Sequence, residues 1–265
     1  MKNNMEALKE NIVGSLNRFF TEVGNILLFT GQVIRQFFSA PFEFKELIRQ
    51  GYYIGNKTLP LIAITGFIMG LVLTLQSRPV MVDFGAESLL PGMIAISIIR
   101  EIGPVITALL CAGKISSGIG AELGAMKVTE QLDAMEVSGA KPLNYVVATR
   151  VMATTILVPI LVFFADAIGL FGSFAALNMR EDISLRLFFS QAFDSLSFAD
   201  VIPATIKTVF FGFFIGLIGS YKGYTADRGT ESVGLSANSA VVTASLVIFI
   251  IDLIAVQISE LIYGF

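Results

Sequence analysis

The chain has 265 residues, of which 54% are hydrophobic and 15% are charged, and its mean hydropathy is +0.76. A soluble domain has about 25% charged residues, so much of this surface must face lipid or a large partner. The net charge of −3 argues against nucleic-acid binding. The absence of His and the single cysteine, Cys111, remove the commonest general base and metal ligands, so we expect no catalytic residue and no metal site.

Residues 1–57 are predicted to form a cytoplasmic and interfacial segment. The first twenty residues include Glu6 and Glu10 and lack the compact apolar core and cleavage site of a signal peptide. Apolar and charged side chains then alternate, and the apolar stretch 23–34 is too short to cross a membrane. This pattern favours an amphipathic helix lying in the membrane interface. A soluble helix packed on a partner is the alternative.

Residues 58–265 are predicted to form a transmembrane domain. A membrane-spanning helix needs about 20 mostly apolar residues. Five segments qualify, namely 58–77, 88–113, 151–179, 201–221 and 232–259. The third is long enough to be one tilted helix or one helix plus a re-entrant piece. The predicted fold class is therefore an all-α integral membrane protein.

The distribution of Lys and Arg predicts the orientation of these spans. Most of the 18 basic residues precede the first span or lie in the loops after spans two and four. By the positive-inside rule, the N-terminus is cytoplasmic and the C-terminus lies on the far side. All six tyrosines fall near span ends, as an interfacial aromatic belt predicts.

Two pairs of glycines have the GxxxG spacing that lets membrane helices approach closely. Gly66 and Gly70 lie in the first span, and Gly212 and Gly216 lie in the fourth. They favour a packed bundle without indicating a particular dimer face.

Charged side chains at bilayer depth are costly and usually face a protein interior or a water-filled cavity. Arg100 and Glu101 are adjacent and point about 100° apart on a helix, so we expect each to have another partner and to line an outward-open cavity. Lys207 and Asp252 could pair between spans four and five, and Asp166 could lie near the far interface. Alternatively, these charged residues could hold neighbouring helices together, or they could relay ions or protons.

On the first span, Leu73, Gln76 and Val80 share one helical face. A mostly apolar face with one amide would suit acyl chains and a polar group near a lipid headgroup. Ordinary helix packing would produce the same pattern.

The loop between spans two and three contains a predicted short helix. Apolar residues recur there at helical spacing and acidic residues take other faces: Val128, Leu132 and Met135 against Glu130, Asp133 and Glu136. Gly139 and Pro142 then end the helix. A cytoplasmic helix of this kind could dock a soluble partner, or it could be a surface helix with no partner.

Residues 112–116 (AGKIS) faintly resemble a phosphate-binding loop. That motif needs Ser or Thr directly after its Lys and a preceding strand, whereas Lys114 is followed by Ile115 at the end of a membrane helix. Any ATPase is therefore expected on a separate chain.

A long ordered block resembles one known family. It comprises residues 98–105 (IIREIGPV), 112–114 (AGK) and 121–135 (AELGAMKVTEQLDAM), with further matches at 66–76, 84–86, 219–234 and Asp252. The chain thereby resembles the MlaE/YrbE permeases, the membrane subunits of MCE-associated ABC transporters. Lys114 stands where the family usually has Arg, which forms bidentate contacts that Lys does not.

The resemblance implies an N-terminal interfacial helix, five spans and a homodimer in the bacterial inner membrane. Its implied partners are ATPase subunits, which bind ATP and Mg, a periplasmic MCE-domain protein and phospholipid. No cofactor is expected in this chain. The resemblance implies coupling to the ATPase through Val128, Thr129, Glu130, Gln131, Leu132, Met135 and Glu136. It implies a lipid-binding region near Arg100 and Glu101. Together with the face on the first span, the residues predicted to bind lipid are Leu73, Gln76, Val80, Phe84, Arg100 and Glu101.

Three other functions are weighed against a lipid permease. An ion-coupled secondary carrier would use Asp166, Lys207 and Asp252 as relay groups. An intramembrane enzyme is disfavoured because the chain lacks His and a catalytic Cys setting. A structural scaffold is the third.

Overall fold

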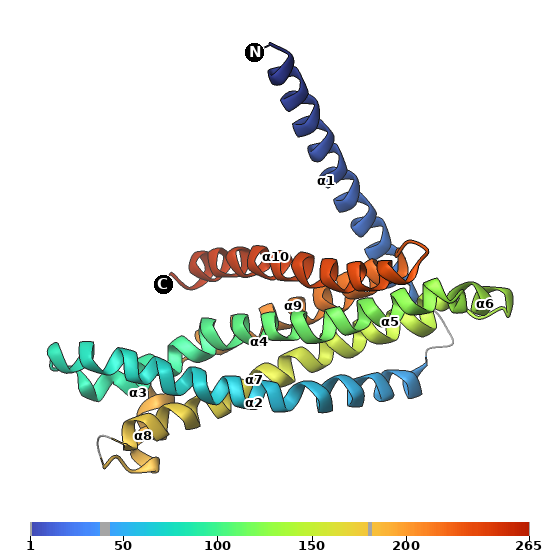
Figure 1. The fold of residues 1–265 in the computed structure, drawn as a ribbon. Helices are drawn as coiled ribbons and strands as arrows, with labels where there is room; N and C mark the ends of the chain where they lie inside the picture. The colour runs from blue at the N-terminus through green and yellow to red at the C-terminus, as the bar shows by residue number, and fades with distance from the viewer. Residues whose placement is uncertain (1, 38–42, 180–181, 265) are drawn as a thin grey trace.

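The computed structural model describes residues 2–37, 43–179 and 182–264. These residues form helices and turns, and no strand occurs among them. Five helical segments are long and apolar enough to cross a membrane, which confirms the predicted number. The segments are Phe44–Asp83, Glu87–Val128, Leu143–Asn178, Phe198–Tyr224 and Thr230–Tyr263. They lie side by side in one elongated bundle (Figure 1).

The second spanning segment is built from shorter pieces. A 3₁₀ turn, Glu87–Leu89, leads into α3 (Leu90–Ser97), α4 (Gly103–Cys111) and α5 (Ser117–Val128). Two π-helical turns, Ile98–Ile102 and Ala112–Ser116, join them. Such turns are rare and frequently occur at functional sites. The first of them carries Arg100 and Glu101.

The first span is longer than its apolar stretch predicts. Helix α2 (Phe44–Asp83) begins well before residue 58 and continues through residue 57, where we predict the end of the N-terminal segment. Its first turns bury Glu46, Gln50 and Ile54, which recur every four residues and form one packed face. Because charged and amide residues interrupt the apolar ones in these turns, hydropathy alone does not mark them as part of a span. The domain boundary at 57 stays a prediction.

The third span is one continuous helix rather than a helix plus a re-entrant piece. A π-helical stretch, Leu143–Ala148, continues into α7 (Thr149–Asn178) as one unbroken helix. Helices α9 (Phe198–Tyr224) and α10 (Thr230–Tyr263) complete the bundle. Half of the apolar window of α9 is buried within the chain, against 17% of that of α10. Helix α10 therefore turns most of its apolar surface outward.

Helix α1 (Lys2–Phe37) leaves the bundle and runs across its long direction (Figure 1). It is anchored by buried Phe29 and Val33. The Phe29 ring meets that of Tyr221 edge-on at 5.4 Å, and Glu22 pairs with Lys222. Its outward side carries exposed apolar residues, including Phe20, Leu27, Leu28 and Ile34.

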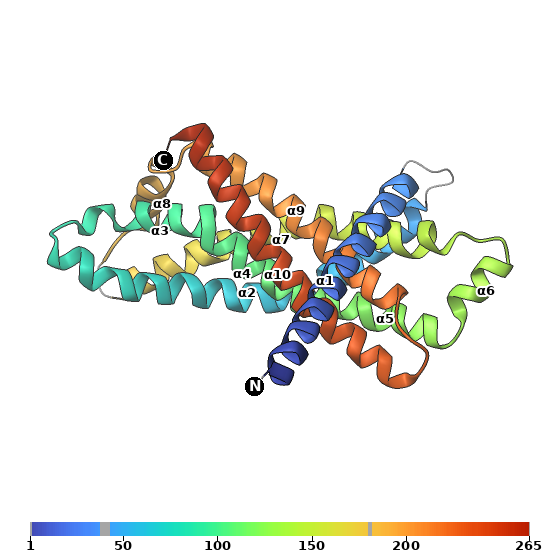
Figure 2. The same cartoon turned by 90° about the horizontal axis from the view of Figure 1, so that it is seen from above.

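Two short helices mark the opposite ends of the bundle. Helix α6 (Gln131–Val137) lies at the end where α1 meets the bundle, and α8 (Leu185–Asp194) lies at the other end (Figures 1 and 2). Helix α8 was not anticipated from the sequence, because ten amphipathic residues are too short for a span. The Ser184 hydroxyl caps it by accepting a hydrogen bond from the Leu187 N–H at 3.2 Å. Phe188 is fully buried in the cluster formed with α3.

The glycine pairs bring helices together as their spacing predicts. A side chain at Gly70 would overlap the carbonyl oxygen of Gly169 on α7, and one at Gly66 would lie 2.9 Å from the Ala165 oxygen. The Thr74 and Ser173 hydroxyls hydrogen-bond at 2.6 Å one turn further along. Gly212 and Gly216 make the equivalent close approach between α9 and α7.

We expect Gly70→Ala to lower the free energy of unfolding by about 1–3 kcal/mol, because the added methyl group forces two backbones apart. Thermal unfolding of the purified protein in mild detergent measures the change. The matched control is Gly55→Ala on the same helix, where the nearest atom would lie 4.0 Å from the new carbon. Equal unfolding temperatures for both variants would contradict the proposed role of the α2–α7 contact.

Candidate functional site

One buried lysine joins three membrane spans. The Lys207 ammonium on α9 donates to a Glu101 carboxylate oxygen at 2.6 Å and to Asp252 Oδ1 on α10 at 3.0 Å. The Lys207 side chain is 4% exposed, against 39% for Glu101 and 20% for Asp252. The predicted Lys207–Asp252 pair is confirmed, and Glu101 is a second partner that the sequence did not indicate.

Arg100 points to a different carboxylate. Its guanidinium lies 3.8 Å from Asp200 Oδ1, so the two adjacent charges do have separate partners, as predicted. Asp200 also accepts hydrogen bonds from the Ser197 backbone N–H at 3.0 Å and hydroxyl at 2.7 Å, which caps the start of α9. Sequence reasoning missed Asp200. The Ser-x-x-Asp capping signature at 197–200 was the available signal.

Loss of the Lys207 ion pairs would cost much free energy because this residue lies deep in the membrane. It lies nine residues into α9, or about 14 Å of helix at 1.5 Å per residue, within a hydrocarbon core about 30 Å thick. A charge at that depth is tolerated when it is paired and hydrogen-bonded. Two carboxylates around one ammonium leave the network with a net negative charge. Glu101 and Asp252 are partly exposed, so polar groups can reach the network through them.

An apolar cavity adjoins this network. It lies between α9 and α10, has a volume of about 330 Å³, and includes Lys207 among otherwise apolar or weakly polar walls. Ile206, Phe210 and Ile254 are representative of those walls. Apolar walls beside a charged network suit the acyl chains of an amphiphile with a polar head.

The predicted lipid-binding residues fall into two separate groups. Arg100 and Glu101 line a small cavity with residues of α9 and α10, and no α2 residue belongs to that lining. Of the α2 residues, Leu73 is partly buried against the α3–α8 cluster. Gln76, Val80 and Phe84 are exposed on the surface of the chain. The described residues of one copy therefore do not bring the two groups into one pocket.

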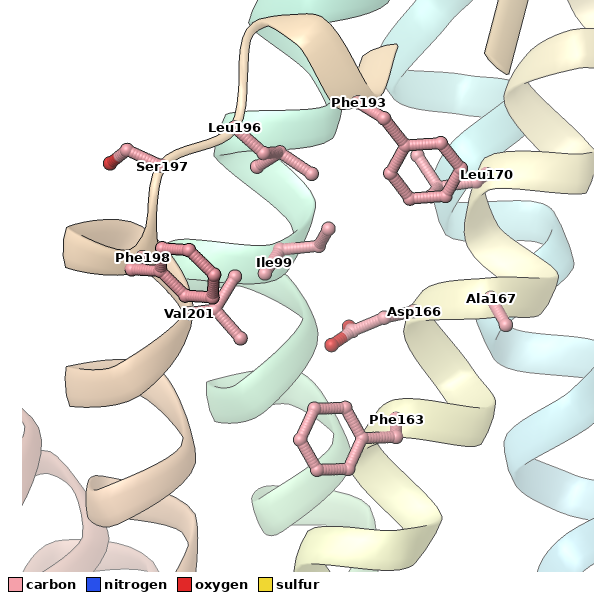
Figure 3. A pocket seen from close by; sticks show the side chains of 10 residues that line it. All are labelled: Ile99, Phe163, Asp166, Ala167, Leu170, Phe193, Leu196, Ser197, Phe198 and Val201. Atoms are coloured by element: carbon pink, nitrogen blue, oxygen red, sulfur yellow. The ribbon is translucent and has the colours of Figure 1, made fainter. Parts of the chain in front are cut away.

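Asp166 lies inside the bundle rather than at the end of its helix. It is 6% exposed and sits twelve residues before the end of α7, about 18 Å of helix. It borders a separate cavity of about 570 Å³ formed by the π-helical turn before α4, by α7, α8 and α9, and by the turn between α8 and α9 (Figure 3). It makes no ion pair with Lys207 in the part of the chain that is described.

The predicted cytoplasmic helix is broken into two parts. Helix α5 ends at Val128, and Glu130 adopts a left-handed conformation with φ of 58° before α6 begins. Leu132 is buried and Met135 packs against the core, so the apolar side of α6 faces its own chain. Among the residues predicted for coupling, the exposed ones are polar: Thr129, Glu130, Gln131 and Glu136.

Two ion pairs hold the region around α6. The buried Arg150 donates to Glu122 at 2.7 Å, and Lys127 pairs with Asp133 at 2.9 Å. The first links α5 to α7, and the second closes the break between α5 and α6. A movement of α6 would therefore be transmitted to the spans that contain α5 and α7 through these two ion pairs.

Comparison with known proteins places this arrangement in a family. The family described as "Permease MlaE" matches residues 47–258. A probable ABC transporter permease protein of Rickettsia typhi is 36% identical over 241 residues, covering 91% of this chain and 93% of the relative. The intermembrane phospholipid transport system permease protein MlaE of Haemophilus influenzae is 36% identical over 217 residues, covering 82% and 83%. TRIGALACTOSYLDIACYLGLYCEROL 1, a chloroplastic protein of Arabidopsis thaliana, is 30% identical over 230 residues, covering 87% and 66%.

The matched region contains the second, third and fourth spans, most of the first and fifth, the charged network around Lys207 and the break before α6. The chain is therefore a multi-pass membrane protein that belongs to the MlaE permease family.

Proposed function

We propose that this chain is the membrane-spanning permease subunit of an ATP-driven transporter that moves phospholipid or a similar lipid between membranes. The observation that carries the proposal is the three-charge network of Lys207, Glu101 and Asp252 beside an apolar groove. The relative from Haemophilus influenzae, named for intermembrane phospholipid transport, supports the same substrate class.

The homodimer is supported by the surface that one copy leaves exposed. Most of the apolar window of α10 is outside the core of the chain, and large apolar side chains such as Leu246, Phe249 and Leu253 are more than half exposed. A second copy packed along α10 would cover this surface and enclose the groove beside Lys207.

The ATP-driven step is assigned to a separate ATPase that docks on α6 from the cytoplasm. Closure of that ATPase would push on the acidic, exposed side of α6, and the Lys127–Asp133 and Arg150–Glu122 pairs would pass the movement to the spans. The periplasmic MCE-domain protein would meet the opposite end, near α8. This arrangement corresponds to the inner membrane, a cytoplasmic N-terminus and α1 lying in the interface.

Purification from the native membrane in mild detergent, followed by mass spectrometry of proteins and lipids, tests the proposal. We expect an ATPase, an MCE-domain protein and a stoichiometric lipid to accompany the chain. A photo-crosslinker at Val137, which is 90% exposed on α6, should capture the ATPase. Recovery of the chain alone, with no ATPase even after crosslinking, would refute the assignment.

An ion-coupled carrier is the second candidate, and the sharing of Lys207 between two carboxylates favours it, since such a group can relay protons. Transport by the purified chain alone, driven by an ion gradient without ATP, distinguishes it from the permease.

A further inference from the structure

The largest cavity described for the chain contains one carboxylate whose role the permease function does not explain. Asp166 is more than nine-tenths buried, and its Oδ1 has no hydrogen-bond partner within the described ranges. Figure 3 shows its carboxyl group projecting from α7 into the space between Ile99 and Phe163. A buried carboxyl group without a hydrogen-bond partner for one of its oxygens is costly, so a positive charge beside it in the cavity would stabilise it.

The surroundings of Asp166 select the kind of ligand. The remaining walls are almost wholly apolar, and three of them are aromatic, Phe163, Phe193 and Phe198. The negative faces of aromatic rings attract cations, with a larger effect where water is excluded. A carboxylate and aromatic rings around an apolar space of about 570 Å³ together favour a hydrophobic molecule that carries one positive charge.

This cavity is distinct from the groove beside Lys207. The two lie on different faces of α9, because Val201 lines the first whereas Ile202 and Ile206 line the second. Lys207, which is bound to Glu101 and Asp252, belongs to the second groove. A smaller hollow lined by Asp166, Thr205 and Thr208 extends the first cavity along the seam between α7 and α9.

Gly103 packs directly against the carboxyl group of Asp166 and leaves room for it. A side chain at Gly103, the first residue of α4, would collide with Asp166 Oδ1. The end of the cavity away from Asp166 is lined by Phe193 of α8, by Ser197 and by Phe198 at the start of α9. The two phenylalanines are largely exposed. The cavity is therefore open at the end of the bundle that carries α8 and closed by Asp166 inside.

We propose that this cavity is a second binding site, separate from the lipid groove, that takes a lipophilic monocation, with Asp166 as the counter-ion and the phenylalanine rings as its walls. The charge could be the ammonium of an amino lipid or of a free amphiphilic amine. Both sources share the same recognition chemistry.

Binding of tetraphenylphosphonium and tetraphenylborate to the purified chain in zwitterionic nanodiscs tests the site, because the two probes have the same shape and opposite charge. We expect saturable binding of the cation, at least tenfold weaker binding by Asp166→Asn, and no saturable site for the anion. The matched control is Asp194→Asn, an exposed carboxyl on α8, which should bind like the parent protein.

A second variant tests the same site independently, in case Asp166→Asn does not fold. Phe193→Leu removes one exposed ring and leaves the buried carboxylate in place, and we expect it to weaken cation binding several-fold with an unchanged unfolding temperature. Competition by dodecylamine but not by dodecanol would extend the site to aliphatic amines, and competition by phosphatidylethanolamine would identify an amino lipid as the source. Unchanged cation binding by either variant, or equal saturable binding of tetraphenylborate, would overturn the proposal.

Discussion

Replacement of Lys207 by Met should reduce ATP-dependent lipid transfer by at least tenfold. Met preserves much of the volume but leaves Glu101 and Asp252 without their shared cation at bilayer depth. Removing one partner of a buried ion pair typically costs about 3–5 kcal/mol, and the partial exposure of Glu101 should place the loss toward the lower end. Transfer of a fluorescent phospholipid between vesicles by the reconstituted complex measures activity, and thermal unfolding measures stability.

A triple variant separates the structural role of this network from its role in transport. Lys207→Met combined with Glu101→Gln and Asp252→Asn removes all three charges, so no carboxylate is left unpaired. We expect the unfolding temperature to recover while lipid transfer stays low. Recovery of both would show that the charges only hold the helices together. Lys45→Met, at an exposed position near the start of α2, is the control for loss of a lysine.

The number of spans could be predicted because each contains about 20 apolar residues, a constraint that the bilayer imposes on any sequence. The Lys207–Asp252 pair could be predicted because unpaired charges are costly there. The Glu101–Lys207 contact could not, since it depends on which spans are neighbours. Asp200 was missed because it lies at the edge of a predicted span, where an acidic residue looks like part of a solvated loop.

The errors in detail also have physical causes. Helix α8 is amphipathic, so burial of one face stabilises it without a long apolar run. The extension of α2 before residue 58 mixes polar and apolar residues on both its buried and its exposed side. The prediction for coupling named both apolar and polar residues of this helix, and in the structure Leu132 and Met135 pack on the chain itself. Periodicity identifies an apolar face but does not say whether it meets the same chain or a partner.

Reversal of two exposed charges, Glu130→Lys with Glu136→Lys, should uncouple lipid transfer from ATP hydrolysis. With the apolar side of α6 turned inward, the polar side is the surface left for the ATPase, and Glu136 is held there by the Tyr224 hydroxyl at 3.3 Å. Unfavourable charge contacts across an interface cost several kcal/mol, so we expect transfer to fall at least tenfold while ATP hydrolysis persists. Parallel assays of phosphate release and phospholipid transfer measure the ratio.

Two control variants determine whether docking or folding is responsible. Glu87→Lys with Glu260→Lys reverses two exposed charges at the end of the bundle opposite α6 and should leave the ratio of transfer to hydrolysis unchanged (Figure 1). Leu132→Ala should lower stability by about 2–5 kcal/mol, because it removes a buried contact rather than a docking one. If the α6 double reversal left transfer per ATP at the parent value, force would have to enter the bundle elsewhere. The exposed surface of α1 would then be the next contact to test, since Glu22 and Lys222 join it to α9.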